Sequence, residues 1–179
     1  MGEELKEWIK VVVSAAVLAL VITQFVVPTS VSGSSMEPAF SDRDYLLVSK
    51  QAYVSAKQPQ RGDVVVFQTH LKDEEGQEKK LIKRVVALPG EIVSIENGKV
   101  YINGEELQET YTADGVTDGI TYPVKVPEGC YFCLGDNRLN SKDSRDLSVG
   151  FVSEDQIVGK VFFRLYPFHE IGWIGREDG

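Results

Sequence analysis

One apolar segment near the N-terminus constrains the fold of this chain more than any other feature. Residues 8–27 read WIKVVVSAAVLALVITQFVV, and twenty residues in an α-helix span about 30 Å, the thickness of the hydrocarbon core of a bilayer. A helix buried in a soluble core would need a polar face, but Ser14 is the only polar residue between Val11 and Ile22. The segment predicts a transmembrane anchor, with residues 1–7 before it and residues 28–179 after it.

The segment could instead be a signal peptide that is removed. Ser30-Val31-Ser32 has the small-x-small pattern of a cleavage site. However, the apolar region is longer than that of a usual signal peptide, and three glutamates precede it. These features favour a retained anchor.

The distribution of basic residues around the segment predicts its orientation. Lys6 and Lys10 lie before the segment or at its start, and no lysine or arginine follows until Arg43. By the positive-inside rule, the N-terminus is expected in the cytoplasm and the remaining domain on the extracytoplasmic side of the cell membrane. Pro28 is expected to end the helix.

Beyond the anchor, the pattern is that of short strands rich in β-branched and aromatic residues. The expected strands cover residues 45–49, 63–67, 81–88, 92–95, 100–102, 122–126, 131–134 and 157–166. Residues 70–80 are charged and predict an exposed hairpin tip, and Asn97-Gly98 is a strong hairpin signal. The pattern predicts a mainly β, coiled antiparallel or barrel-like fold, with a small hairpin subdomain at about residues 92–130.

The net charge and the few cysteines and histidines argue against several classes of function. The net charge is −8, and no cluster of lysine and arginine occurs, which argues against a nucleic acid partner. Cys130 and Cys133 lie on an expected strand, where residues three apart face opposite sides, so a redox pair is not expected. His70 and His169 form neither a Ser-His-Asp triad nor a zinc motif, and we predict no metal or other cofactor.

Two segments carry groups suited to nucleophilic catalysis. The turn at residues 31–38 contains three candidate hydroxyls, those of Ser32, Ser34 and Ser35. Lys83 is the only polar residue on its face of an otherwise apolar strand, and burial of a lysine favours the neutral amine, which can take a proton from a serine. A lysine at a strand end with its amine in solvent would give the same pattern.

The loop at residues 135–145 is dense in hydroxyls, carboxylates and arginines. Such a loop can hold a site through side-chain hydrogen bonds and ion pairs, although a solvated surface loop has a similar composition. Ser141 and Ser144 could orient an amine, while Asp143 could pair with Arg145 or Arg84.

Four segments in order after the apolar run resemble the bacterial type I signal peptidase family over nearly the whole chain. They are Gly33-Ser-Ser-Met-Glu-Pro38, Arg61-Gly-Asp-Val-Val-Val-Phe67, Ile82-Lys-Arg-Val-Val-Ala-Leu-Pro-Gly90 and Gly135-Asp-Asn-Arg-Leu-Asn-Ser-Lys-Asp-Ser-Arg145. The resemblance implies that Ser35 is the nucleophile and Lys83 the general base. It also implies that Ser141 orients the lysine, with support from Asp143, Arg145 and Arg84.

The resemblance further implies cleavage of exported preproteins after a small residue, without a cofactor and beside the lipid bilayer. The substrate would bind extended along the strand of Lys83 and the segment around Ser35. The candidate substrate-binding residues are Gly33, Met36, Leu81 and Ile82. Some members have a serine in place of Gly33 that helps to bind the oxyanion; here the backbone N–H of Ser35 and another donor would have to do so. Ala39 stands where threonine is usual.

Two other functions would fit parts of this pattern. A self-cleaving Ser/Lys protease of the repressor type would share the fold but carry a DNA-binding helical domain in place of the anchor. A membrane-tethered β domain could bind extended peptides without cutting them, and it would not depend on Ser35 or Lys83.

Overall fold

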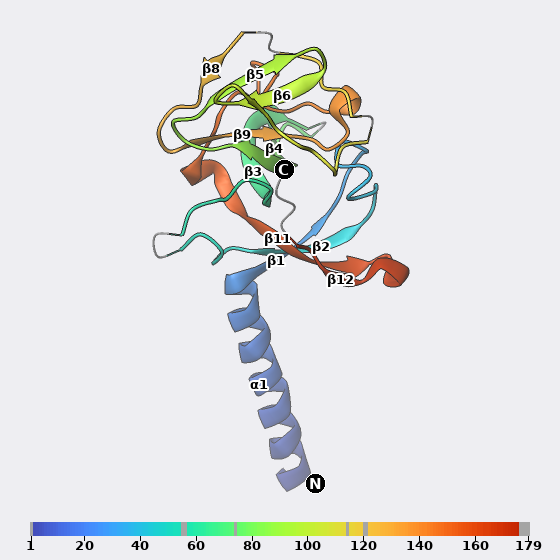
Figure 1. Ribbon diagram of the computed structural model, residues 1–179. Coiled ribbons are helices and arrows are strands. Elements are labelled where there is room, and N and C mark those ends of the chain that lie inside the picture. Colours follow the sequence, from blue (N-terminus) through green and yellow to red (C-terminus); the bar gives the residue numbers. More distant parts are fainter. Residues whose placement is uncertain (1, 55–56, 74, 114, 120–121, 176–179) are drawn as a thin grey trace.

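The computed structural model describes residues 2–54, 57–73, 75–113, 115–119 and 122–175. Helix α1, Gly2–Phe25, projects as a separate rod from the β-rich part of the chain, and none of its residues is buried (Figure 1). It is long and apolar enough to cross a membrane. It begins earlier than predicted, so that residues 2–7 are helical, and it ends two residues before the predicted boundary; Met1 and residues 176–179 lie outside the described chain.

The helix ends early because the next residues pair in a sheet. Strand β1, Val26–Ser30, lies antiparallel to β2, Tyr45–Ser49, with Val27 opposite Val48. Pro28 therefore lies within a strand and does not itself end the helix. Strand β1 is at the edge of its sheet, where a residue without an N–H is accommodated.

The larger sheet has the strand order β1-β2-β11-β3-β4-β9-β10, with β12 paired to β11, and all of these pairs are antiparallel. The bounds of the strands not yet given are β3 Val64–Lys72, β4 Glu78–Ala87, β9 Cys130–Leu134, β10 Val152–Ser153, β11 Ile157–Tyr166 and β12 Gly172–Trp173. Within the described chain the outer strands β1 and β10 do not pair, so the sheet does not close into a barrel. The predicted mainly β, antiparallel fold is confirmed.

A smaller sheet lies at the end of the molecule away from α1 (Figure 1). Its order is β7-β6-β5-β8, with bounds β5 Ile92–Glu96, β6 Lys99–Ile102, β7 Glu105–Glu106 and β8 Val124–Lys125. Asn97 and Gly98 both have positive φ, 50° and 79°, and form the predicted hairpin turn between β5 and β6. Val93 and Ile102 share one apolar cluster with Phe132 of β9, so this sheet packs on the larger one.

Strand β4 positions the site. It lies between β3 and β9, and residues 83–87 are buried, as predicted for an interior strand. Val85 and Val86 belong to different apolar clusters, so both faces of the strand are packed. Its exposed first residues continue the hairpin with β3, where Lys72 lies opposite Glu78, so the turn is shorter than predicted.

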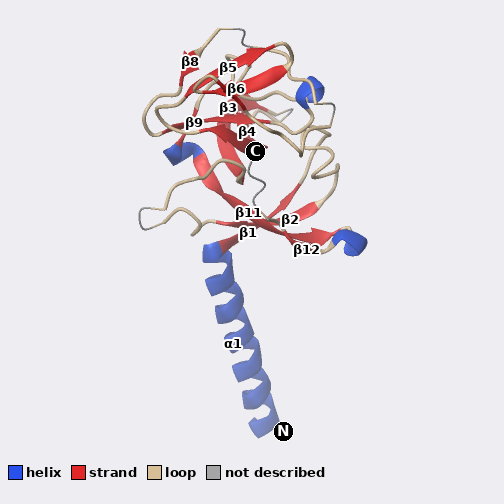
Figure 2. Cartoon of the chain, viewed as in Figure 1, coloured by secondary structure: helices blue, strands red, loops and turns tan. Residues whose placement is uncertain are grey.

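Figure 2 shows that, apart from α1, the described chain consists of strands, loops and short helical turns. The turns are η1 Arg138–Asn140, η2 Glu154–Gln156 and η3 Phe168–Glu170.

Candidate active site

The serine turn after β1 is held in place by backbone hydrogen bonds and by two buried side chains. The N–H of Val31 donates to the carbonyl of Asp44 at 2.9 Å, and the side chains of Val31 and Met36 are buried in one apolar cluster. Gly33 has a φ of +86°, a conformation that glycine adopts without strain, although a Cβ would meet no atom within 4 Å. The turn thereby fixes the half-buried Ser35 beside β4.

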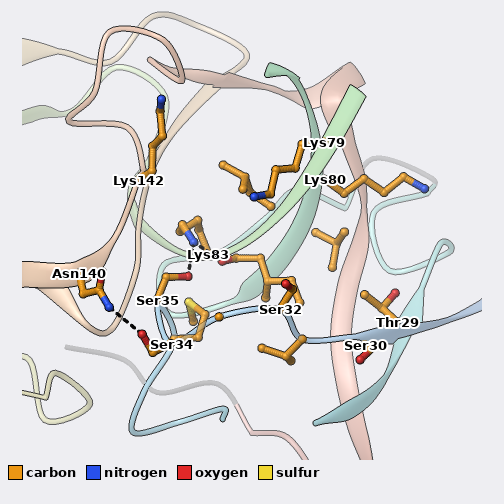
Figure 3. Close-up of a pocket in the computed structure, with 16 residues that line it drawn as sticks. Thr29, Ser30, Ser32, Ser34, Ser35, Lys79, Lys80, Lys83, Asn140 and Lys142 are labelled. Atoms are coloured by element: carbon orange, nitrogen blue, oxygen red, sulfur yellow. Dashed lines mark hydrogen bonds between the residues drawn. The ribbon is translucent and has the colours of Figure 1, made fainter. Parts of the chain in front are cut away.

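Lys83 lies against this serine. Its Nζ donates to Ser35 Oγ at 2.7 Å and to the carbonyl of Ile82 at 2.8 Å (Figure 3). The residue is only 2% exposed, which rules out the solvent-exposed alternative. Burial lowers the pKa of Lys83 from 10.5 to about 8, although the carboxylates of Asp143 and Asp136 act in the opposite direction. A largely desolvated amine thus faces a serine hydroxyl at hydrogen-bond distance.

The polar loop after β9 packs against this pair. Ser144 Oγ accepts a hydrogen bond from the N–H of Cys133 at 2.9 Å, so Ser144 holds the loop to β9, and no hydrogen bond joins it to Lys83 within the described chain. Asp143 accepts from the N–H of Gly135 at 3.0 Å and pairs with Arg145 at 2.8 Å. The structure thereby selects Arg145 as the partner of Asp143.

Ser141 is half-buried, and its hydroxyl oxygen is buried close to the nucleophile segment. A Cβ on Gly135 would lie 2.2 Å from Ser141 Oγ and 2.4 Å from the carbonyl oxygen of Ser35, so only glycine fits between them. Within the described chain, Ser141 Oγ has no hydrogen-bond partner. Its orientation of Lys83 stays a prediction.

Arg84 faces away from Ser35, on the opposite side of β4. Its Nε and Nη2 donate to the two carboxylate oxygens of Asp136 at 2.9 and 2.6 Å, and its Nη1 donates to the carbonyl of Gly62 at 3.0 Å. The guanidinium also lies 4.1 Å from the ring centre of Tyr111. Arg84 therefore fixes the start of the polar loop to β4.

Sequence reasoning missed a second buried ion pair at this loop. Arg138 donates from Nε to the carbonyl of Gly135 at 2.9 Å and binds Glu109 through both terminal nitrogens, at 2.7 and 2.5 Å. Asn140 Nδ2 also donates to Ser34 Oγ at 2.7 Å. The sequence indicated the polar loop as a whole as a candidate site. However, nothing near Glu109 in the sequence identifies Glu109 as the partner of Arg138.

An open cleft of about 360 Å³ extends from the Ser35–Lys83 pair. Residues 29–36 and 79–83 line most of it, and they include the predicted Gly33, Met36, Leu81 and Ile82. Strand β9 pairs with β4 only from Arg84 onward, so within the described chain residues 79–82 lack a strand partner on the side away from β3. An extended peptide can bind to such an edge by adding a strand.

Comparison with known proteins decides the family. The family model described as "Signal peptidase, peptidase S26" matches residues 5–166. The chain belongs to this family. The predicted resemblance and the predicted enzyme class, a serine endopeptidase of the signal peptidase I type, are thereby confirmed.

Relatives in this family match most of the chain. A signal peptidase I from Bacillus amyloliquefaciens is 39% identical over 178 residues, which cover 92% of this chain and 87% of the relative. Signal peptidase I T from Bacillus subtilis (strain 168) gives the same identity and coverage. Signal peptidase IB from Staphylococcus aureus (strain Mu50) is 36% identical, covering 95% of this chain and 94% of its own.

The crystal structure of a signal peptidase I from Enterococcus faecalis V583 is 34% identical in sequence. It matches 59% of this chain and 98% of that chain, with a TM-score of 0.44.

Proposed function

We propose that this protein is a membrane-anchored serine endopeptidase that removes signal peptides from exported preproteins, with Ser35 as nucleophile and Lys83 as general base. The observation that carries the proposal is the 2.7 Å hydrogen bond between a buried lysine amine and a serine hydroxyl at the end of an open cleft. Membership of the signal peptidase family supports the choice of substrate.

The reaction follows from the positions of these two groups. Ser35 Oγ attacks the carbonyl carbon of the small residue that precedes the cleaved bond, and its proton passes to the neutral amine of Lys83. The C–N bond then breaks, and Lys83 returns the proton to the leaving amine. In the second half, Lys83 takes a proton from water, and the water oxygen attacks the ester carbonyl carbon. The bond between this carbon and Ser35 Oγ then breaks, and Lys83 returns the proton to Ser35 Oγ, which restores the hydroxyl and the neutral amine.

The oxyanion formed in both halves needs hydrogen-bond donors. The N–H of Ser35 donates to no acceptor in the described part of the chain, so it is free to serve. Gly33 offers no hydroxyl. Among the supporting residues we propose that Ser141 orients the lysine, and that Asp143, Arg145 and Arg84 hold the loop that carries it.

The anchor places this chemistry close to the membrane. Ser35 lies ten positions after the helix end at Phe25, and an extended chain of ten positions spans at most about 35 Å. Lys6 and Lys10 lie in the first part of the helix, and the next basic residue is Arg43, which favours an N-terminus in the cytoplasm. We therefore propose that a preprotein is cleaved on the extracytoplasmic side, where the end of its own apolar segment leaves the bilayer.

The test is incubation of the detergent-solubilised full chain with a preprotein. We expect cleavage by the wild type, loss of cleavage in Ser35→Ala and in Lys83→Ala, and wild-type cleavage in Lys125→Ala, an exposed lysine on β8. Preprotein binding without cleavage by the wild type, or cleavage by Ser35→Ala, would overturn the proposal. The first of these results would identify a domain that binds extended peptides without cutting them.

A further inference from the structure

The charge of the cleft is opposite to that of the protein. The chain has a net charge of −8, yet four lysines line the cleft, and no aspartate or glutamate occurs among its described lining residues. These lysines are Lys79, Lys80, Lys83 and Lys142. A cleft lined with charges of one sign concentrates ligands of the opposite sign. The cleft therefore attracts acidic groups even though the whole molecule repels them.

Lys79 is the best placed of these cations to meet a bound peptide. Figure 3 shows its amine pointing toward the middle of the cleft, whereas the amines of Lys80 and Lys142 point away from Ser35. Lys142 also lies 3.7 Å from the carboxylate of Asp146. Lys79 makes no ion pair within the described chain, and its charge is near enough to lower the pKa of Lys83.

The first residues of β4 lie toward the end of the cleft nearest the anchor. Thr29, four residues after the helix, lines the cleft, and Figure 3 shows Thr29 and Lys80 on the same side of the view, away from Ser35. If α1 spans the bilayer, a signal peptide leaving the same bilayer enters the cleft at this end. Residues of the signal peptide that precede the cleaved bond thus run along the first half of β4.

The spacing along β4 gives the residue of a bound preprotein, counted from the cleaved bond, that would lie beside Lys79. Lys79 precedes Lys83 by four residues on the same face of a strand, a distance of about 13 Å at about 3.3 Å per residue. A peptide paired with this strand advances at the same rate. We propose, given the proposed function, that Lys79 binds an aspartate or glutamate of the preprotein about three to five residues before the cleaved bond.

The effect should be modest and dependent on salt, because Lys79 is exposed. Ion pairs at exposed positions change equilibria by about two- to fivefold, and about 0.5 M salt reduces the Debye length to about 4 Å. The preference for an acidic residue should thus be visible as a ratio of kcat/KM values at low salt.

The experiment uses the full chain in an uncharged detergent and short peptides that share one cleavage site. Each set carries glutamate, glutamine or lysine at one position, and the position is moved along the peptide on both sides of the cleaved bond. We expect the wild type to favour glutamate over glutamine about two- to fivefold at one or two positions before the bond. The preference should vanish in Lys79→Gln and reverse to favour lysine in Lys79→Glu.

Ratios are the readout because Lys79 also lowers the pKa of Lys83, so its substitution changes the rate for every peptide. Lys125→Gln is the matched control and should keep the wild-type ratio. Equal rates for glutamate and glutamine at every position, or a ratio that survives in Lys79→Gln but is lost in Lys142→Gln, would overturn the proposal. Cleavage of the glutamine peptides that depends on Ser35 would leave the proposed function standing in both cases.

Discussion

Two adjacent basic residues on β4 are equally buried and lie in opposite environments. Lys83 and Arg84 are each 2% exposed. Lys83 faces the cleft, where its hydrogen-bond acceptors are a hydroxyl and a carbonyl, and no carboxylate of the described chain lies within ion-pair distance. Arg84 faces the other side of the strand and binds both carboxylate oxygens of Asp136.

The difference shows how one strand can hold the proposed base and a structural cation side by side. Burial without a paired anion favours the neutral form of Lys83, which makes the amine a base near neutral pH. A guanidinium stays protonated, and its two parallel bonds to Asp136 keep its charge compensated. The two residues are therefore not interchangeable, although both are cations in solution.

The largest effect should come from replacing Lys83, the proposed base, with arginine, the residue type that lies next to it on β4. Lys83→Arg keeps the positive charge but removes the ability to accept a proton near neutral pH, so we expect kcat/KM to fall by about 10²- to 10⁴-fold. The measurement is cleavage of a fluorogenic peptide by the solubilised chain, with circular dichroism as a check of folding. A folded variant within tenfold of the wild type would show that Lys83 is not the general base.

The two positions should respond to methionine with opposite effects on stability. Arg84→Met breaks the buried ion pair with Asp136 and should lower the free energy of unfolding by about 3 to 5 kcal/mol. Lys83→Met removes a buried amine that is charged below pH 8 and should raise the free energy of unfolding by roughly 1 to 3 kcal/mol at pH 7. Denaturant unfolding followed by circular dichroism measures both.

A double variant provides the control for this comparison. Arg84→Met with Asp136→Leu removes both members of the ion pair and should recover most of the stability lost in the single variant. If the double variant is no more stable than Arg84→Met, the loss comes from packing around the arginine and not from the broken ion pair.

Local pattern in the sequence was enough to predict most of the fold. The interior position of β4 followed from its apolar residues on both faces, and the β5–β6 turn followed from Asn97-Gly98. The end of α1 could not be predicted in this way, because Val26 and Val27 are apolar enough for a membrane helix. They leave the helix because residues about twenty positions later pair with them. The open form of the larger sheet likewise depends on which strands pair, and the hydrophobic periodicity of the sequence does not predict strand pairing.

In the site, too, local pattern predicted some features, and tertiary packing determined the others. Periodicity showed that Lys83 was unusual but left its burial open, and the pairing with Ser35 came from the family resemblance. The Arg138–Glu109 ion pair joins segments 29 positions apart, and neither segment carries a motif for the other. Partners chosen by tertiary packing leave no trace in a single sequence, which is why the choice of Arg145 over Arg84 for Asp143 also needed the structure.

The smallest effect tests the contrast between the two cations through pH. The proposed base, Lys83, can accept a proton only when it is neutral. Burial lowers its pKa to about 8, so the neutral fraction grows as pH rises through 8 and is lost as pH falls. We expect kcat/KM for a peptide without ionisable side chains near the bond to fall by about 50-fold between pH 8 and pH 6. The measurement is a pH–rate profile of the solubilised chain under low substrate concentration.

Arg84→Lys is the matched control for that profile, since it places a second lysine on β4 at the same depth of burial. Its amine would lie beside the carboxylate of Asp136, which favours the charged form, so the new lysine should stay protonated and leave the midpoint near pH 8 unchanged. A flat wild-type profile between pH 6 and pH 8 would contradict a lowered pKa at Lys83. A midpoint that moves in Arg84→Lys would mean that the two faces of β4 are electrostatically coupled and that burial alone does not explain the difference between them.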